Sequence, residues 1–364
     1  MKTILVASYY FPPCNIISAQ RAQSFADNFS RHGLYPIIVT RHWEGTENST
    51  SGYESENLKP PVVTENEKYT LIQLPYPAQL KGRVSELLIR SRFGKLLLYA
   101  TLYARGTINP KCNADKAFYP FVAEYLKKTP VDFILATVFP MNTIKLASRL
   151  SKQFGPKLIV DFRDLWDNEL LSETYRPRFS ARIQNFFYEF YLRRWLENAE
   201  LITMVSDPLG NHIQRIAPKT RTAVITNGFE RHVFADARKN FALGKDKFRF
   251  SVIGTLEPKL DLTVMIKGLN LFLQGKDLDR IQLSFVGTAA FPEIKSMLEN
   301  ALPSRCTRIT ERIPREKAIR AMVESHVLFH AGWRGFRGMA SGKIYEYLGA
   351  GRNILIAPND HDVM

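Results

Sequence analysis

The stretch Ser341-Gly342-Lys343-Ile344-Tyr345-Glu346-Tyr347-Leu348-Gly349-Ala350-Gly351 is the part of the sequence that decides the fold. It lies between two apolar runs, 327–329 and 354–356, which predict buried strands. A glycine-flanked loop that opens a helix directs backbone N–H groups at a ligand, and Lys343 adds a positive charge. Glu346, one turn later, can accept hydrogen bonds from hydroxyl groups. A phosphate beside a diol is the chemistry of a nucleotide sugar, but the same pattern also occurs in helix caps that bind nothing.

The composition predicts a globular protein of two domains. The chain has 364 residues, of which 45% are hydrophobic and 23% charged. It shows neither an apolar run long enough for a membrane span nor a signal-peptide pattern after Met1. The three cysteines are scattered, which predicts neither disulfides nor a metal site and favours a reducing cytosol. The net charge of +15 calls for an anionic partner: nucleic acid, anionic lipid or a phosphorylated substrate.

The first half begins with a strand–helix–strand pattern. An apolar run at 4–7, a helix from Ser18 and a second apolar run at 36–40 predict a parallel sheet, with its functional edge at the carboxyl ends of the strands. A later apolar run, 158–160, leads into Asp161-Phe162-Arg163-Asp164-Leu165-Trp166 at that same edge. Two interpretations stay open for these acids: they bind a ligand, or Arg163 pairs internally with one of them.

The segment from Leu80 to Arg105 combines large apolar side chains with six basic residues and a single acid, Glu86. Such a composition suits a helix that lies in an anionic membrane interface. A core helix with a basic outer face is the alternative. A second aromatic helix, expected from Phe179 to Glu197, is predicted to be mostly core.

A second series of alternating strands and helices begins at Phe248. The polar, basic stretch 231–247 is predicted to be a hinge between the halves. We therefore expect an α/β protein with two Rossmann-like domains that face a cleft, an acceptor-side domain at 1–235 and a nucleotide-sugar-binding domain at 246–364.

Several short motifs, in this order and spacing, resemble the retaining GT-B glycosyltransferases of family 4, a large group that includes bacterial surface-polysaccharide enzymes. The motifs are Tyr10-Phe11-Pro12-Pro13 with Ala19 and Arg21, Asp161-Phe162-Arg163-Asp164-Leu165-Trp166, Ser206, Thr226-Asn227-Gly228-Phe229, Gly254-Thr255-Leu256, and Lys343 with Glu346-Tyr347-Leu348.

The resemblance implies hexosyl transfer with retention from a nucleotide diphosphate donor to a saccharide or lipid-linked acceptor. Together with the basic, apolar segment Leu80 to Arg105, it predicts a cytoplasmic protein that is peripheral on the inner face of the cytoplasmic membrane. It implies that the donor is bound by Gly254, Thr255, Lys259, Gly342, Lys343 and Glu346. It places Asp164, Arg163 and Asp161 on the acceptor side as the catalytic candidates. It implies no cofactor and no metal, since basic groups and helix N-termini can neutralise the leaving diphosphate.

The sequence departs from the family pattern at three places. Gly338 stands where the commoner form has a second glutamate, and Ile16-Ile17-Ser18 replaces the usual glycines of the N-terminal loop. The chain also ends before the C-terminal helices usual in the family, which predicts an incomplete second domain. A non-catalytic nucleotide-sugar-binding or scaffold protein is therefore the alternative function, and a nucleic-acid-binding protein is a third that rests on charge alone.

Overall fold

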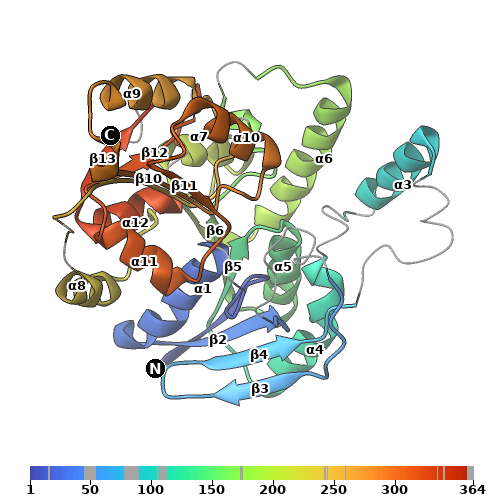
Figure 1. The fold of residues 1–364 in the computed structure, drawn as a ribbon. Coiled ribbons are helices and arrows are strands. Elements are labelled where there is room, and N and C mark those ends of the chain that lie inside the picture. The colour runs from blue at the N-terminus through green and yellow to red at the C-terminus, as the bar shows by residue number, and fades with distance from the viewer. Residues whose placement is uncertain are drawn as a thin grey trace. The chain divides into compact units, whose positions relative to one another are not determined.

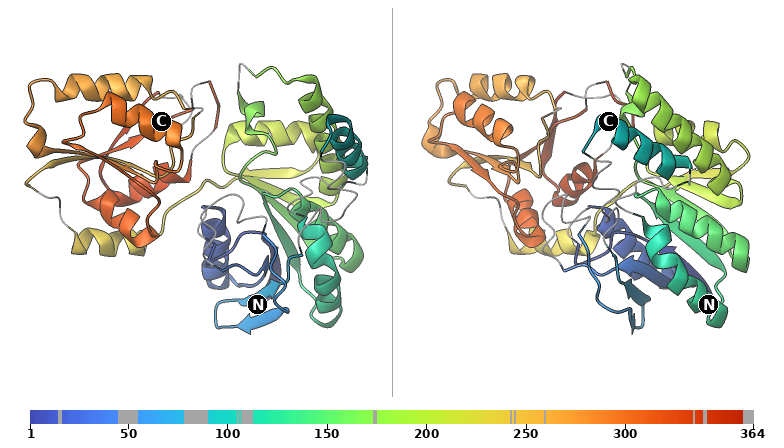
Figure 2. Two further views of the ribbon diagram at one scale, coloured as in Figure 1. Left: turned by 45° about the vertical axis from the view of Figure 1, so that its right-hand side comes forward. Right: turned by 90° about the vertical axis from the view of Figure 1, so that its right-hand side faces the viewer.

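The computed structural model describes residues 1–14, 17–44, 55–77, 90–104, 106, 113–172, 175–241, 243, 245–258, 260–333, 335–338 and 341–358. The chain forms two compact units (Figures 1 and 2). Unit 1 comprises Met1–Leu170 and Tyr175–Thr226, and unit 2 comprises Leu171–Thr174 and Asn227–Met364. The division after Thr226 differs from the expected boundaries of 1–235 and 246–364. The helix that follows it packs its buried Phe234 into the core of unit 2.

Unit 1 is built on an eight-stranded sheet in the order β3-β4-β2-β1-β5-β6-β7-β8 within the described residues. Its strands are β1 (Lys2–Ala7), β2 (Leu34–Arg41), β3 (Val62–Glu65), β4 (Thr70–Leu74), β5 (Phe133–Val138), β6 (Lys157–Phe162), β7 (Ala199–Met204) and β8 (Arg221–Val224). All neighbouring pairs are parallel except β3 with β4. The central strands are apolar on both faces, as expected for a parallel sheet covered by helices.

Helices connect these strands. They are α1 (Ile17–Asn28), α3 (Arg92–Ala104), α4 (Ala114–Lys128), α5 (Asn142–Phe154), α6 (Phe179–Leu196) and α7 (Asp207–Ile216), with short 3-10 turns at Phe29–His32 and Asn168–Leu171. The polar region 45–68 contains the edge strand β3. Its residues Val62, Val63 and Thr64 are β-branched, which favours pairing with β4 although the strand is exposed.

Unit 2 is a smaller parallel sheet in the order β11-β10-β9-β12-β13. Its elements are α8 (Arg231–Asn240), β9 (Phe248–Ile253), α9 (Thr263–Leu273), a 3-10 turn (Leu278–Arg280), β10 (Ile281–Val286), α10 (Pro292–Ala301), β11 (Thr307–Thr310), α11 (Arg315–Val323), β12 (Val327–His330), α12 (Gly342–Ala350) and β13 (Asn353–Ile356). Figure 1 shows α9 and α10 on one face of this sheet and α8, α11 and α12 on the other. A separate apolar cluster fills each face.

Both sheets have the doubly wound Rossmann order. Numbered within unit 2, the strands run 3-2-1-4-5, so the chain reverses direction across the sheet between β9 and β12. In unit 1 the same reversal lies between β1 and β5. Ligands of such sheets bind outside the carboxyl ends of the strands at this point.

The segment predicted to contact a membrane, Leu80 to Arg105, is described over residues 90–104, where α3 forms; Leu80, the residues up to 89, and Arg105 lie outside the described residues. The helix predicted from Phe179 to Glu197 is present as α6, but several of its aromatic side chains are exposed rather than buried in the core. Among the described residues, no helix has both the length and the apolar character that crossing a bilayer requires.

Candidate functional site

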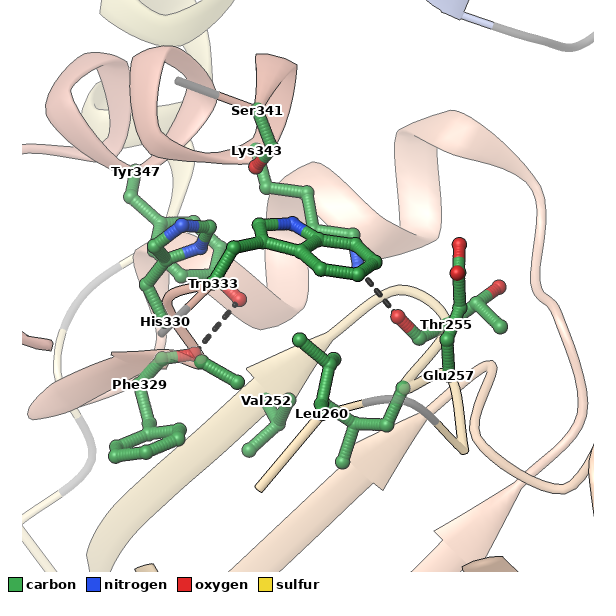
Figure 3. Close-up of a pocket in the computed structure, with 12 residues that line it drawn as sticks. Val252, Thr255, Glu257, Leu260, Phe329, His330, Trp333, Ser341, Lys343 and Tyr347 are labelled. Carbon is green, nitrogen blue, oxygen red and sulfur yellow. Dashed lines mark hydrogen bonds between the residues drawn. The ribbon is translucent and has the colours of Figure 1, made fainter. Parts of the chain in front are cut away.

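A cavity of about 140 Å³ opens at the reversal point of unit 2. Val252 and Phe329, near the carboxyl ends of β9 and β12, form part of its floor, and the loop after β9 contributes Thr255 and Glu257. Figure 3 shows the Lys343 side chain extending from the start of α12 toward Thr255. Lys343 lies on the helix side of the cavity, and Val252 lies on the strand side. The cavity is therefore placed where the fold is expected to bind its ligand.

Helix α12 holds its place because its inner face is fixed to two strands. Ile344 and Tyr347 are buried, and the Tyr347 side chain is completely covered. The Tyr347 hydroxyl accepts a hydrogen bond from the backbone N–H of Ile253 at 2.8 Å, and lies 3.3 Å from the carbonyl of Phe329, to which it can donate. One phenol in the second turn of the helix thus ties α12 to β9 and β12. Ser341 precedes the helix but its side chain makes no capping bond, which leaves the first N–H groups of α12 without that partner.

Lys343 carries the positive charge of the site. Its ammonium donates to the carbonyl oxygen of Thr255 at 2.5 Å. Burial lowers the pKa of Lys343 to about 8, with Glu257 opposing and Arg312 reinforcing the shift. Gly254 makes room for this arrangement. Its φ is +104°, and a Cβ at this position would lie 2.6 Å from the Lys343 Cε atom.

Two further polar side chains of the site each have a buried atom that lacks a hydrogen-bond partner among the described residues. His330, the last residue of β12, is 4% exposed, and its Nε2 atom is unpaired. Burial and the nearby Lys343 lower the pKa of His330 to about 4, so the ring is neutral at physiological pH. The Ser341 hydroxyl is also unpaired. Both residues line the cavity, where a ligand could supply the missing partners.

Glu346 lies one turn into α12, largely buried, with a side chain that is 14% exposed. Its carboxylate is 3.5 Å from the Arg315 guanidinium, which also lies 3.0 Å from Glu230. Burial raises the pKa of Glu346, and the positive charge of Arg315 opposes that shift. The carboxylate expected to accept hydrogen bonds from hydroxyl groups of the donor is therefore already paired with Arg315, and Arg315 has a second acid, Glu230, within reach.

The acidic cluster predicted after β6 separates into two different environments in unit 1. Asp161 is 1% exposed and receives two hydrogen bonds of 2.7 Å from Arg21, and a third of 2.6 Å from the Thr203 hydroxyl. Arg21 also donates to the carbonyl oxygens of Ile225 and Thr226. Asp161 therefore forms an internal ion pair, as one of the two interpretations predicted, but its partner is Arg21 and not Arg163.

Asp164 is more accessible, with a side chain that is 32% exposed. The Arg163 guanidinium donates to its Oδ2 and also to the Ser18 hydroxyl. The internal pairing considered for Arg163 thus exists with Asp164. The two residues remain at the carboxyl edge of the sheet, within reach of solvent.

The structure brings Gly254, Thr255, Lys343 and Glu346 together in unit 2, with Gly342 as the first residue of α12. Lys259 lies outside the described residues. Asp161, Arg163 and Asp164 all belong to unit 1.

Sequence reasoning did not single out His330 or Trp333, and it did not recognise Tyr347 as the anchor of α12. His330 ends an apolar run at the edge where ligands bind, which was a usable signal. Trp333 had no such signal, because it lies in an irregular loop. In Figure 3 its indole lies over the cavity, near His330 and the end of the Lys343 side chain.

Comparison with known proteins gives a match only at the level of structure. No protein-family model matches the chain, and no curated protein does. A structure titled trehalose-6-phosphate from E. coli, bound with UDP-2-fluoro glucose, is 11% identical with a TM-score of 0.61, over 98% of this chain and 84% of that one.

Two further solved structures match over the same share of this chain, 98%. A UDP-forming α,α-trehalose-phosphate synthase from Burkholderia vietnamiensis is 11% identical, with a TM-score of 0.58 over 84% of its length. The Burkholderia xenovorans enzyme in complex with glucose-6-phosphate is also 11% identical, with a TM-score of 0.59 over 85% of its length. These matches confirm the GT-B fold class. At this identity the likeness is one of fold, so function has to be argued from the site.

Proposed function

We propose that the protein is a glycosyltransferase that moves a sugar, with retention, from a nucleotide diphosphate donor to an acceptor. The observation that carries the proposal is the position of Lys343 and the start of α12 at the reversal point of a Rossmann-like sheet. Buried positive charge and unpaired donors at that point favour an anion. The solved structures that share the fold include one bound with UDP-2-fluoro glucose and a trehalose-6-phosphate synthase used to study glycosyltransfer with retention.

In this proposal Lys343 and the first N–H groups of α12 bind the diphosphate. Gly254 and Thr255 form the wall beside it, with Lys259 as a further basic contact. Glu346 binds the ribose hydroxyls once it leaves Arg315. As the bond between sugar and diphosphate breaks, negative charge develops on the leaving oxygens, and these groups stabilise it without a metal ion or another cofactor.

The acceptor side is assigned to Asp164 and Arg163, with Asp161 holding the strand end beneath them. We keep a saccharide or lipid-linked acceptor, in a family 4-like role in cell-surface polysaccharide synthesis, as the proposed substrate class. A phosphorylated sugar is a second acceptor to test, because one structural neighbour is in complex with glucose-6-phosphate.

We also propose that the protein works in the cytoplasm as a peripheral protein on the inner face of the cytoplasmic membrane, and not on nucleic acid. The basic, apolar composition of Leu80–Arg105 and the net charge of +15 support an anionic surface as partner.

Calorimetric titration with UDP-, GDP- and ADP-sugars tests the donor site. We expect one nucleotide to bind, and Lys343→Ala and Glu346→Ala each to weaken it by about one to two decades, the cost of a charge-assisted hydrogen bond. Lys317→Ala, on the exposed part of α11, is the control and should bind as the parent does. Unchanged affinity in both site variants would remove this cavity as the donor site.

One observation favours the non-catalytic alternative. Gly338 occupies the position of the family's other glutamate and has a φ of +69°, a conformation in which a glutamate would be strained. Release of nucleoside diphosphate from the bound donor separates the two functions. Tight binding without release, across saccharide, lipid-linked and sugar-phosphate acceptors, would establish a binding protein.

A further inference from the structure

The outer side of α6 carries an exposed apolar stripe. Phe179, Ile183, Phe186 and Phe190 recur at intervals of four and three residues, which places them along one side of the helix. They are 77%, 39%, 65% and 49% exposed. We call these four residues the aromatic face.

The inner side of the same helix already fills the core of unit 1. Tyr188, Leu192 and Trp195 are buried there. Because the opposite side of α6 already packs in the core, the aromatic face stays exposed on the surface of unit 1. An exposed apolar face of this kind indicates a binding partner outside the unit.

A neighbouring helix carries a second exposed apolar pair. Phe93 and Leu97 on α3 are four residues apart and are 76% and 52% exposed. The two helices touch where Tyr103 stacks on Phe187, with ring centroids 5.9 Å apart. Both helices lie on the right-hand side of unit 1 in Figure 1.

Basic residues surround the aromatic face. Arg182, Arg193 and Arg194 are exposed on α6, and two further exposed arginines precede it at 176 and 178. The helix contains a single acid, Glu189, whose carboxylate is 3.8 Å from Arg193. A second copy of this chain would bring the same arginines against one another in a symmetric contact, so a self-association through this face is disfavoured. The complementary partner is anionic at its surface and apolar beneath it.

We propose that the aromatic face docks the protein on an anionic lipid bilayer. Phe186 and Phe190 enter the boundary between headgroups and acyl chains, while Arg182, Arg193 and Arg194 contact the headgroups. This inference rests on the membrane association proposed above and assigns it to α6 instead of Leu80–Arg105. Donor turnover in solution tests the transferase separately, so the two proposals can fail independently.

Sedimentation with vesicles of phosphatidylglycerol and phosphatidylcholine tests the apolar contact. We expect the parent to bind them, and Phe186→Ser with Phe190→Ser to weaken binding by at least about tenfold, because the buried apolar area is lost. The matched control is Val264→Ser with Leu271→Ser, two exposed apolar residues on α9, which should bind as the parent does.

The charged rim is tested in the same way. Arg182→Gln with Arg194→Gln is expected to weaken binding by about thirtyfold at low salt, and the loss should shrink as salt screens the headgroups. Lys267→Gln with Lys276→Gln removes the same charge from exposed positions of unit 2 and serves as the control.

Three results would overturn the proposal. The first would be a parent protein that stays in the supernatant with phosphatidylglycerol vesicles at low salt. The second would be a Phe186 and Phe190 variant that binds as tightly as the parent, which would return the membrane contact to Leu80–Arg105. The third would be a dimer in analytical ultracentrifugation that the same two substitutions dissociate, which would make a second copy the partner.

Discussion

Asp161 and Asp164 stand three positions apart, yet substitution should affect mainly stability at Asp161 and mainly sugar transfer at Asp164. Asp161→Asn breaks a buried, doubly hydrogen-bonded pair with Arg21 and is expected to cost about 3–5 kcal/mol of unfolding free energy. Asp164→Asn loses a partly exposed pair and should cost about 0–1 kcal/mol, while it lowers sugar transfer and leaves nucleotide affinity nearly unchanged. Urea unfolding, calorimetry and a transfer assay measure the three quantities. If Asp164→Asn transfers sugar normally, this carboxylate is purely structural.

Gly254 is required by its backbone conformation and by the lysine beside it. Gly254→Ala places a Cβ against Lys343 at a φ of +104°, and is expected to destabilise the protein by about 1–3 kcal/mol. Gly268→Ala is the matched control, since nothing lies within 4 Å of the added Cβ in the middle of α9. It should stabilise the protein by about 0.5–1 kcal/mol. Equal effects of the two substitutions in denaturant titrations would contradict this account.

The depressed pKa of Lys343 makes donor binding depend on pH. Below about pH 8 the lysine is already charged; above it, binding a diphosphate requires the uptake of a proton. Affinity should therefore fall as pH rises, approaching about tenfold per pH unit. Because the folded pKa lies below the ordinary value, folding stability should rise over the range from about 8 to 10.5. Calorimetry across this range checks the affinity, and the Lys343→Gln variant should show no such dependence.

For single residues, the sequence was informative where a charged residue follows a predicted strand and a glycine loop, as Lys343 and Glu346 do. It could not indicate that Arg315 engages Glu346, because that contact joins two helices separated in the chain. It also could not identify Arg21 as the partner of Asp161, since the pair joins residues 140 positions apart.

Among the elements, α12 depends on a single phenol. Tyr347→Phe leaves the buried N–H of Ile253 without its acceptor, which should cost about 1–3 kcal/mol of unfolding free energy. It should also weaken nucleotide binding, since α12, which presents its first N–H groups to the diphosphate, is no longer fixed to β9. Tyr345→Phe, on a half-buried neighbour in the same helix, is the control. Chemical denaturation of the two variants, with calorimetry of nucleotide binding, provides the measurement; matching results would show that the hydroxyl of Tyr347 does not anchor the helix.

The strands flanking the site were predictable because each is a short apolar run bounded by turn residues. The faces of α6 were not, because its aromatic residues surround the helix and periodicity alone does not distinguish a covered side from an exposed one. The edge strand β3 was hidden in a polar region for a related reason: its four residues are all exposed, so burial left no pattern in them.

For the whole molecule, alternation of strands and helices was enough to predict two Rossmann-like domains. The position of the boundary was harder to predict. The sequence of α8 is mostly polar, so it gave no sign of the domain to which the helix belongs. Its two buried residues, Phe234 and Ala237, assign it to unit 2.

Because each unit has its own sheet and its own apolar clusters, we expect calorimetric unfolding in two transitions. Arg21→Gln should lower the transition of unit 1, and Tyr347→Phe should lower that of unit 2, which assigns them. A nucleotide that binds at Lys343 should then raise the transition temperature of unit 2. At a nucleotide concentration a hundredfold above its dissociation constant, the unfolding free energy of that unit should increase by about 2.7 kcal/mol. One transition that both variants and the nucleotide shift together would mean that the two cores unfold as one cooperative body. A nucleotide that stabilises only unit 1 would move the donor site away from α12.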